Sequence, residues 1–269
     1  DNWVSTAGPI VRLLEIKISN YVKSKKTVSF INGTSALQIA LKLIGATKKT
    51  EIIAPTVTFV APINAIIYNG SSPIFMDADK YCNIDIEKTI QFLKENTFLR
   101  SGFCFNKKTK KKIVGVIVVH VWGNAVFLDK LIRICKERNI KIIEDASESL
   151  GSKYKLGKFK GKYTGTVGDI GVYSFNGNKI ITGGCGGALV TNNSKYAKYA
   201  KYLSTQAIDN PDFYIHNEVG YNFRMASINA ALCISQLKKL KIFIKKKKKI
   251  HDQYKKKIKN LTKYELVST

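Results

Sequence analysis

One lysine of this chain stands in a closely specified setting. Lys179 lies in the stretch "SFNGNKIITGGCGG", residues 174–187, after a short apolar run and before a cluster of glycines. A lysine amine is a useful nucleophile at neutral pH only where the fold partly removes it from water or places it beside other positive charge. The setting therefore distinguishes Lys179 among the 45 lysines and arginines of the chain and makes it a candidate nucleophile.

A carboxylate and a group of small polar residues occupy comparable positions. Asp145 ends the apolar run "IKIIED", and Glu144, Asp145 and Glu148 lie so close in sequence that their mutual repulsion favours a nearby cation. Thr34 and Ser35 follow the β-branched run "TVSFI" and open a predicted helix, where free N–H groups and hydroxyls bind anions. Each group has a structural alternative. The stretch "DASESL" fits a helix start capped by Asp145 and Glu148, and Thr34 or Ser35 fits an ordinary helix cap.

These three groups together suit one cofactor. Ligands of open α/β sheets bind beyond the carboxyl ends of the strands, which is where the lysine, the carboxylate and the anion site are expected to meet. Pyridoxal phosphate requires a lysine amine for its aldehyde, a carboxylate that keeps its pyridine nitrogen protonated, and a cradle for its phosphate. The sequence therefore predicts a pyridoxal 5'-phosphate site built on Lys179, Asp145 and the 33–35 turn.

Other chemistries find less support. The three histidines, His120, His216 and His251, are too far apart in sequence to form a metal cluster, so no metal site is expected. The chain has no GxSxG nucleophile elbow, and "GGCGG" lacks the spacing of a dinucleotide-binding loop. The five cysteines are scattered without CxxC spacing, which fits a reducing compartment. No apolar run has the length of a membrane span and no leader is evident, so we expect a cytoplasmic protein with no membrane partner.

Alternating strands and helices are predicted to position the site. In the N-terminal half, short apolar runs alternate with segments of helical spacing, which is typical of βαβ units in a parallel sheet buried on both faces. The runs "DIGVYSF" and "GALVT" are separated by only about a dozen residues, too few for a helical crossover, so one antiparallel strand is expected. The predicted strands are 27–31, 51–55, 73–77, 112–120, 140–145, 169–175 and 187–191, and the predicted helices are 9–22, 33–45, 60–68, 84–93, 127–138, 196–203 and 226–240 with a helical continuation.

The net charge of +26 comes mainly from two lysine runs. Residues 238–263 hold 13 lysines against Asp252, and "KKTKKK" at 107–112 adds five positive charges, so the two runs carry 17 of the 26. Only five arginines occur, although arginine is the better bidentate ligand of phosphate, and no basic face interleaved with aromatics is visible. We therefore interpret the lysines as solvated surface and expect no specific nucleic-acid partner, with weak, salt-sensitive polyanion binding as the alternative.

Several stretches in a fixed order resemble one enzyme family. They spread from residue 32 to 232 and read "NGTSALQIALKLIG", "PTVTFVAPINAI", "VHVWGN", "IIEDASESLGSKY", "TGTVGDIGVYSFNGNKIITGGCGGALVTNN" and "GYNFRMASINAAL". At these residues the sequence resembles the DegT/DnrJ/StrS family of sugar aminotransferases. The resemblance implies an α/β fold of the aspartate-aminotransferase type (fold type I), with a mostly parallel sheet, flanking helices and one antiparallel strand. It also implies a homodimer with shared active sites.

The resemblance implies a domain division as well. Residues 1–235 correspond to the large pyridoxal-phosphate-binding domain. Residues 236–269 correspond to the start of a C-terminal small domain and form a long lysine-rich helix. Members of the family continue into a fuller C-terminal domain, so we expect this small domain to be truncated here.

The family's site residues carry over by position. Lys179 resembles the lysine that holds the cofactor aldehyde as a Schiff base, and Asp145 resembles the partner of the pyridine nitrogen. The other matching positions serve the cofactor or the substrate: Thr34, Ser35 and Ser174 contact the phosphate, Phe59 stacks on the ring, Glu148 lies near the hydroxyl face where other members carry Gln or His, Asn222 reaches the partner subunit's phosphate, and Arg224 contacts substrate.

The implied reaction is an amino transfer from glutamate, or glutamine, to a ketone on a nucleotide-linked deoxysugar. The stretches "STAG", "NGNK", "GGCGG" and "STQA" most resemble the branch acting on UDP-linked 4-keto-6-deoxy-HexNAc sugars, which would yield a 4-amino sugar for cell-surface glycans. Two alternatives stay open: a 3-keto sugar nucleotide aminotransferase, and a catalytically silent relative that binds the cofactor or serves in regulation.

Overall fold

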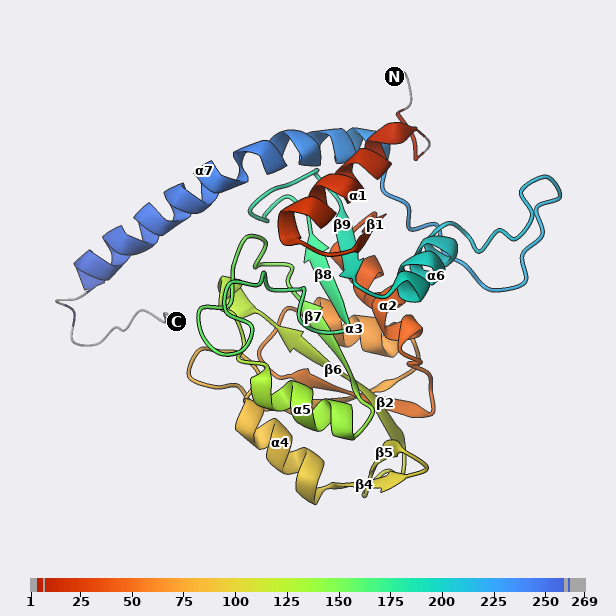
Figure 1. Cartoon of the computed structure of the whole chain (residues 1–269), viewed down its shortest axis with the longest axis vertical. Helices are drawn as coiled ribbons and strands as arrows, with labels where there is room; N and C mark the ends of the chain where they lie inside the picture. Colours follow the sequence, from red (N-terminus) through yellow and green to blue (C-terminus); the bar gives the residue numbers. More distant parts are fainter. Residues whose placement is uncertain (1–3, 7, 259–260, 262–269) are drawn as a thin grey trace.

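A computed structural model describes residues 4–6, 8–258 and 261 (Figure 1). The described residues form a nine-stranded mixed sheet whose main path runs β1-β9-β8-β7-β6-β2-β3, with β5 pairing β6 and β4 pairing β5. The strands are β1 (Lys26–Phe30), β2 (Thr50–Pro55), β3 (Ser72–Met76), β4 (Thr97–Arg100), β5 (Phe103–Asn106), β6 (Lys112–Val119), β7 (Lys141–Asp145), β8 (Ile170–Ser174) and β9 (Gly187–Thr191).

Helices cover both faces of this sheet, which is why its central strands are almost continuously apolar. They are α1 (Pro9–Val22), α2 (Gly33–Leu43), α3 (Val60–Tyr68), α4 (Ile86–Glu95), α5 (Asp129–Glu137), α6 (Ser194–Ser204) and α7 (Ser227–Ile258), with a short 3-10 turn, η1, at Val121–Gly123. Helices α2, α3 and α6 pack on one face, and α1, α7, α4 and α5 pack on the other.

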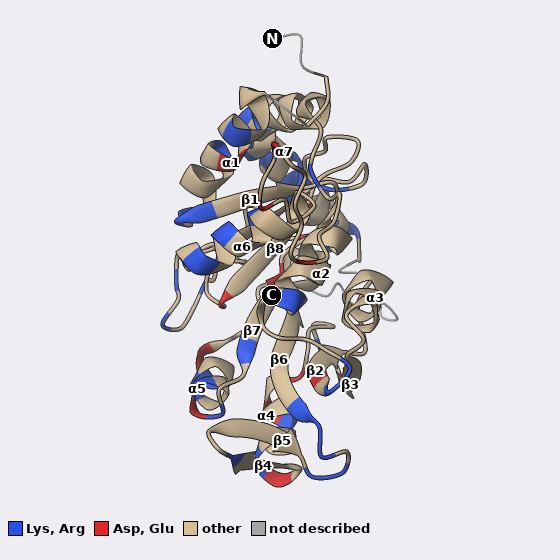
Figure 2. Ribbon diagram, turned by 90° about the vertical axis from the view of Figure 1, so that its right-hand side faces the viewer, with Lys and Arg blue, Asp and Glu red and all other residues tan. Residues whose placement is uncertain are grey.

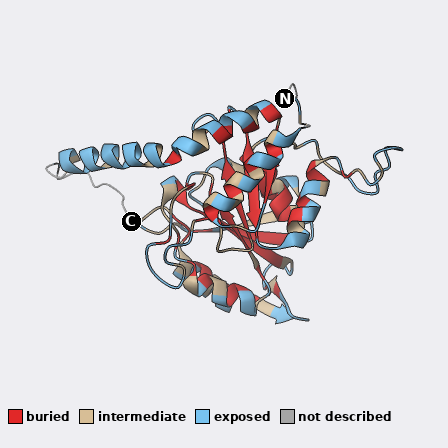
Figure 3. Cartoon of the chain, turned by 45° about the horizontal axis from the view of Figure 1, so that its top comes forward, coloured by how far each residue is buried: buried red, intermediate tan, exposed pale blue. Residues whose placement is uncertain are grey.

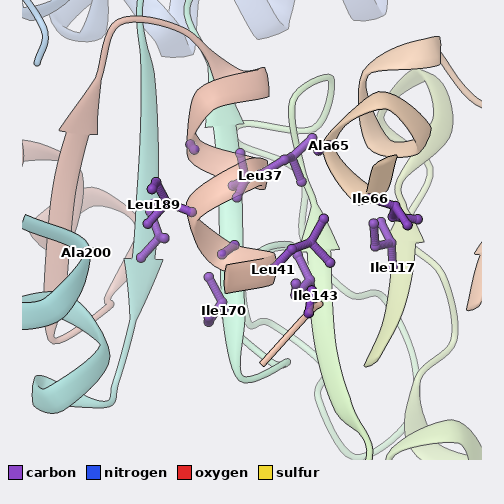
Figure 4. Close-up of a cluster of buried hydrophobic side chains, with 14 of the residues drawn as sticks. Leu37, Leu41, Ala65, Ile66, Ile117, Ile143, Ile170, Leu189 and Ala200 are labelled. Atoms are coloured by element: carbon purple, nitrogen blue, oxygen red, sulfur yellow. The ribbon is translucent and has the colours of Figure 1, made fainter. Parts of the chain in front are cut away.

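Successive residues of a strand supply opposite cores because side chains alternate across a sheet. Val172 of β8 and Leu189 of β9 pack under α2, whereas Tyr173 and Ala188 pack under α1 and α7. Figure 4 shows Leu37 and Leu41 of α2 and Ala65 and Ile66 of α3 lying over Ile117, Ile143, Ile170 and Leu189 of the strands. This packing fixes α2, whose N-terminus is part of the predicted anion site.

Every strand and helix predicted from the sequence is present within a few residues of its expected position. Strand β9 pairs antiparallel with both β1 and β8, which confirms the expected antiparallel strand. The expectation of only one such strand is wrong, because β4 and β5 form an additional antiparallel hairpin against β6. Ser101 and Gly102 make its turn, both with positive φ, and the strands are four residues long, too short for a periodic signal.

Helix α7 is continuous from residue 227 to 258 and extends well beyond the body of the molecule (Figure 1). Its first half contributes Ala230, Cys233 and Leu240 to the core under α1, and its second half is mostly exposed (Figure 3). The predicted division at 235/236 falls inside this helix and stays a prediction.

The lysines and arginines are spread over many elements. In Figure 2 they lie on α1, on α6, at the start of β1 and in the turn between β5 and β6, among other places. Of the helices that the structure describes, none combines the length and apolar character needed to cross a bilayer.

Candidate active site

The predicted site residues follow strands that end at one edge of the sheet. Strands β2, β6, β7 and β8 are mutually parallel, and β1 points the same way because β9 is antiparallel to both β1 and β8. Their carboxyl ends therefore meet at a common edge, where α/β proteins bind their ligands. Asp145 and Ser174 are the last residues of β7 and β8, and Asn32, Phe59 and His120 follow the ends of β1, β2 and β6.

Lys179 lies in a closed loop between β8 and β9. The loop is tied at its base by Phe175, whose N–H donates to Gly186 O at 2.8 Å and whose carbonyl accepts from Gly183 N at 3.0 Å. The Asn229 side chain on α7 donates to Gly183 O at 2.6 Å, so the long helix also holds this loop. The fixed backbone that the sequence predicts for Lys179 is therefore present.

The Lys179 amine is paired with Glu148. The two side chains lie 3.2 Å apart, Nζ to Oε1, and only 15% of the Lys179 side chain is exposed. The other Glu148 oxygen accepts from Trp122 N at 3.0 Å, which orients the carboxylate. The acidic cluster around Asp145 thus has the nearby cation that its charge favours, and that cation is Lys179.

Asp145 is 5% exposed and receives the Ser147 N–H on Oδ1 at 3.0 Å. Burial raises the pKa of the Asp145 carboxyl, while the hydrogen bonds from Ser147 and the charge of Lys179 act in the opposite direction. Residues 146–150 form turns and no helix, and Glu148 is directed to Trp122 instead of back to Asp145. The helix-start interpretation of "DASESL" is therefore wrong, and Asp145 is available to a ligand.

The start of α2 forms a polar turn against the end of β8. Asn32 is the helix cap, accepting Ser35 N at 2.8 Å, so the interpretation of Thr34 or Ser35 as the cap is wrong. A Cβ on Gly33 would lie 3.0 Å from Ser174 Cβ and 3.4 Å from Ser147 Oγ, which shows how closely the turn approaches these serines. Helix N–H groups beside hydroxyls make a site for a phosphate.

Three predicted site residues make no hydrogen bond or ion pair with this centre among the described residues. Phe59 is the N-cap residue of α3 and is 76% exposed. Asn222 is exposed and pairs with Thr205 in an isolated bridge, and Arg224 has a buried Nε without a hydrogen-bond partner. Within the described part of the chain, no hydrogen bond joins any of the three to Lys179 or Asp145, so their roles stay predictions.

Sequence reasoning missed the residues that orient the centre. Trp122 has φ 52° and ψ 21°, a left-handed conformation that is uncommon for a bulky residue and that no periodic pattern reveals. In the sequence, His120 is only one of three distant histidines, and Glu144 is only one member of an acidic cluster. In the structure the two side chains are 2.8 Å apart and fully buried. Neither has a sequence signal that separates it from an ordinary core position.

Comparison with known proteins decides the family. The chain matches the DegT/DnrJ/EryC1/StrS aminotransferase family over residues 1–269. It belongs to this family. The family predicted from the sequence is thereby confirmed, and with it a dependence of the family on pyridoxal phosphate.

Named relatives differ in substrate. The chain is 37% identical to GDP-perosamine synthase of Escherichia coli O157:H7, covering 96% of this chain and 66% of the relative. It is 32% identical to UDP-4-amino-4,6-dideoxy-N-acetyl-beta-L-altrosamine transaminase of Campylobacter jejuni, covering 93% of this chain and 62% of the relative. These relatives carry different nucleotides in their names, so the comparison leaves open the branch that the sequence predicts.

Solved structures of the family share the fold. Helicobacter pylori PseC, an aminotransferase involved in the biosynthesis of pseudoaminic acid, superimposes with a TM-score of 0.82 at 26% identity, covering 97% of this chain and 66% of that one. A DegT DnrJ EryC1 StrS aminotransferase from Brucella abortus gives a TM-score of 0.85. The chain thus has the aminotransferase fold, and it covers 66% of the length of GDP-perosamine synthase, PseC and the Brucella abortus protein.

The residues present fit the family's cofactor. Three groups lie at one edge of the sheet. They are the Lys179 amine, the buried Asp145 carboxylate, whose raised pKa is partly lowered by the charge of Lys179, and the start of α2, which packs closely against Ser147 and Ser174. These are the amine, the acid partner and the phosphate site that pyridoxal phosphate needs. Asp145 and the α2 turn would hold the cofactor's nitrogen and phosphate, and Lys179 would hold its aldehyde.

Proposed function

We propose that this chain is the catalytic part of an aminotransferase that moves an amino group from glutamate to a ketone on a nucleotide-linked deoxysugar. The observation that carries the proposal is the partly buried Lys179–Glu148 pair beside Asp145, at the edge where the α2 turn offers an anion site. Membership of a sugar aminotransferase family supplies the substrate class. A cytoplasmic location is part of the same proposal.

The chain's own residues would divide the work as follows. The bound cofactor supplies an aldehyde that accepts the amino group and a ring that stores the electron pair released at the donor's Cα. Lys179 Nζ would remove the proton from that Cα and hold it for return to the bound group. Glu148, 3.2 Å from Nζ, holds the amine in place between these steps. Asp145 would pair with the protonated ring nitrogen, and the turn at Thr34 and Ser35, with Ser174, would bind the phosphate.

The acceptor is proposed as a class. The UDP-linked 4-keto-6-deoxy-HexNAc sugars remain our first choice, because the stretches "STAG", "NGNK", "GGCGG" and "STQA" resemble that branch. The relative named for GDP-perosamine makes a GDP-linked keto sugar the second member to test.

A second copy of the chain completes the proposed site. Asn222 is exposed, and the segment between α6 and α7 that carries it extends away from the body (Figure 1). Within this segment, Phe213 and Tyr214 lie in the turn closed by the Asn210–Ile215 bridge and are 76% and 75% exposed. A homodimer in which these aromatics are covered, and in which Asn222 reaches the other copy's phosphate turn, accounts for this exposure. Arg224 is proposed to contact the substrate.

The test follows the two halves of the reaction separately. Purified chain is loaded with pyridoxal phosphate and mixed with glutamate, and 2-oxoglutarate is measured by mass spectrometry. The protein, whose cofactor now carries the amino group, is then mixed with UDP-linked and GDP-linked 4-keto and 3-keto sugars. We expect 2-oxoglutarate in the first step and one amino sugar in the second. Binding of the cofactor without 2-oxoglutarate would instead favour the silent, regulatory alternative.

The pH dependence of cofactor binding should reflect the protonation of Asp145. Because the pKa of Asp145 is raised above its usual 3.8, mainly by burial, the carboxyl is neutral below that raised pKa and cannot pair with a protonated ring nitrogen. We expect cofactor affinity to fall as pH is lowered through that pKa. In Asp145→Asn this acid limb should disappear, and affinity at neutral pH should weaken about 10- to 100-fold, the loss of one charge-assisted pair.

The free energy of unfolding of the cofactor-free chain should change with pH in the opposite direction to cofactor affinity. An acid whose pKa is raised by folding stabilises the fold at pH below its unfolded pKa, and this contribution is lost as pH rises through the folded pKa. The ionised Asp145 therefore destabilises the cofactor-free chain at neutral pH, and Asp145→Asn should raise its melting temperature. A variant with both weaker binding and a lower melting temperature would contradict this assignment, and calorimetry with and without cofactor separates the two.

A further inference from the structure

A second carboxylate, Glu144, lies on the opposite face of β7 from Asp145 and is fully buried. Its two oxygens receive five hydrogen bonds. Oε2 accepts from two side chains and one backbone N–H, and Oε1 accepts from two backbone N–H groups. The donors are His120 Nε2 at 2.8 Å, Tyr154 Oη at 2.7 Å and Gly165 N at 2.7 Å to Oε2, and Val167 N at 2.6 Å and Gly168 N at 2.5 Å to Oε1.

These contacts define the protonation of the pair. His120 Nδ1 accepts from Val126 N at 3.2 Å, so the ring carries its proton on Nε2 and donates it to Glu144. All five neighbours of the Glu144 oxygens donate, so the group accepts as an ionised carboxylate. The pair is therefore a carboxylate and a neutral imidazole in the Nε2–H form.

His120 directly precedes η1, the turn that contacts the partner of Lys179. The backbone N–H of His120 donates to Asp145 O at 3.1 Å, and the next residue, Val121, begins η1. Within η1, Trp122 adopts its left-handed conformation and presents its N–H to Glu148. Glu148 in turn holds Lys179. Hydrogen bonds thus connect Glu144 to His120, and Trp122 to Glu148 and the Lys179 amine. The backbone of η1 joins His120 to Trp122.

We propose that Glu144 is a positioning residue for Lys179: its carboxylate fixes the His120 ring and the η1 turn, so that the Trp122 N–H keeps Glu148 against the lysine amine. The proposal rests on the proposed function for the meaning of Lys179, but its geometry concerns this chain alone. Glu144 touches no reacting atom. It acts by setting the tautomer of His120 and the path of η1.

The carboxylate is required because every one of its neighbours donates. In Glu144→Gln, one oxygen becomes an NH2 group. If the amide nitrogen replaces Oε1, it faces the N–H groups of Val167 and Gly168. If it replaces Oε2, His120 must accept on Nε2 and move its proton to Nδ1, which then faces Val126 N–H. The first arrangement leaves two backbone N–H groups without their acceptor, and the second changes the tautomer of His120, which precedes η1. Tyr154→Phe is the matched control, because it removes one donor and leaves the carboxylate with four.

The experiment uses cofactor-free protein and two readouts. Nitrogen-15 NMR of the histidine rings reports the His120 tautomer, and limited acetylation with peptide mass spectrometry reports the availability of the Lys179 amine. Glu144→Gln should shift the nitrogen-15 signals of His120, with loss of the Nε2–H signature where the amide nitrogen replaces Oε2. It should also speed Lys179 acetylation by about threefold to fivefold, the gain expected when an ion pair of this strength opens. Glu148→Gln should reproduce the acetylation change with the His120 signature intact.

Several results decide against the proposal. An unchanged His120 signature and unchanged Lys179 acetylation in folded Glu144→Gln would overturn it, as would an equal effect in Tyr154→Phe. If Glu144→Gln does not fold, a second pair of variants decides. His120→Leu should open the Lys179 pair, and His120→Gln, whose amide keeps one donor and one acceptor, should restore it. Failure of that rescue would also overturn the proposal.

The outcome for the proposed function is read separately. Both readouts need no cofactor, so they decide the role of Glu144 even if the chain never binds pyridoxal phosphate. If the tautomer and acetylation results are as expected and the loaded chain still makes no 2-oxoglutarate, the positioning role stands and the proposed aminotransferase activity fails.

Discussion

Replacement of Lys179 by alanine is expected to abolish covalent capture of pyridoxal phosphate and to slow 2-oxoglutarate formation from glutamate by about 10²- to 10⁴-fold. Lys179 is the amine that the β8–β9 loop presents beside Asp145 and Glu148. Without it no group remains at that position to hold the aldehyde or to move the proton at the donor's Cα. The measurement is borohydride reduction of the loaded protein, followed by peptide mass spectrometry and a single-turnover assay.

The control for this prediction is another lysine of the same chain. Lys160 is exposed in the long connection between β7 and β8, so Lys160→Ala should keep both capture and turnover at the level of the unchanged chain. In Lys179→Ala, cofactor found on a different lysine at full occupancy, or 2-oxoglutarate formed at an undiminished rate, would show that Lys179 is not the reacting amine. Unchanged melting temperatures in both variants exclude unfolding as the cause of the loss.

The strands and helices that frame this site could be predicted because each depends on a local pattern. The apolar run "KIVGVIVVH" forms β6 because both faces of a central strand are buried. Helix α1 begins after Gly8 with a proline in its first turn and ends at Val22, where Lys23 adopts the left-handed conformation. Such signals need no knowledge of distant residues.

The contacts at the site could not be predicted in the same way, because they join distant segments. Lys179 and Glu148 are 31 residues apart, and Glu148 is oriented by Trp122, a further 26 residues away. The five donors around Glu144 come from residues 120 to 168. The sequence supplied the residue types for a lysine, an acid and a phosphate turn, and only the tertiary structure assigns their partners.

The antiparallel strand β9 links the fold to the function. The chain leaves the edge of the sheet after Ser174, forms the loop with Lys179, and re-enters the same edge at Gly187. Strand β9 can then lie between β8 and β1, so that Gly186 pairs with Asn32 in a bridge. The loop with the lysine and the turn with the phosphate site are therefore neighbours because of this strand order.

That close approach makes Gly187 a position where a single methyl group should disturb the phosphate turn directly. A Cβ on Gly187 would lie 2.5 Å from Asn32 C, 2.6 Å from Asn32 O and 2.7 Å from Gly33 N. All three atoms belong to the backbone, so no side-chain rotation relieves the contact, and the α2 turn must move. In Gly187→Ala we expect a loss of about 1–3 kcal/mol in the free energy of unfolding. Cofactor affinity should fall by about 10- to 100-fold, because a shift of roughly 1 Å in a binding group has effects of this size.

Gly177 provides the matched control on the same loop. A Cβ there would meet no atom within 4 Å, and its φ is not positive. Gly177→Ala should therefore leave cofactor affinity unchanged and stabilise the chain by about 0.4–1 kcal/mol, since alanine restricts the unfolded chain. Thermal unfolding and cofactor titration of both variants check the pair. Equal affinities in Gly187→Ala and Gly177→Ala would mean that the α2 turn is not the phosphate site. A loss of affinity confined to Gly187→Ala would tie cofactor binding to the backbone contact between β9 and that turn.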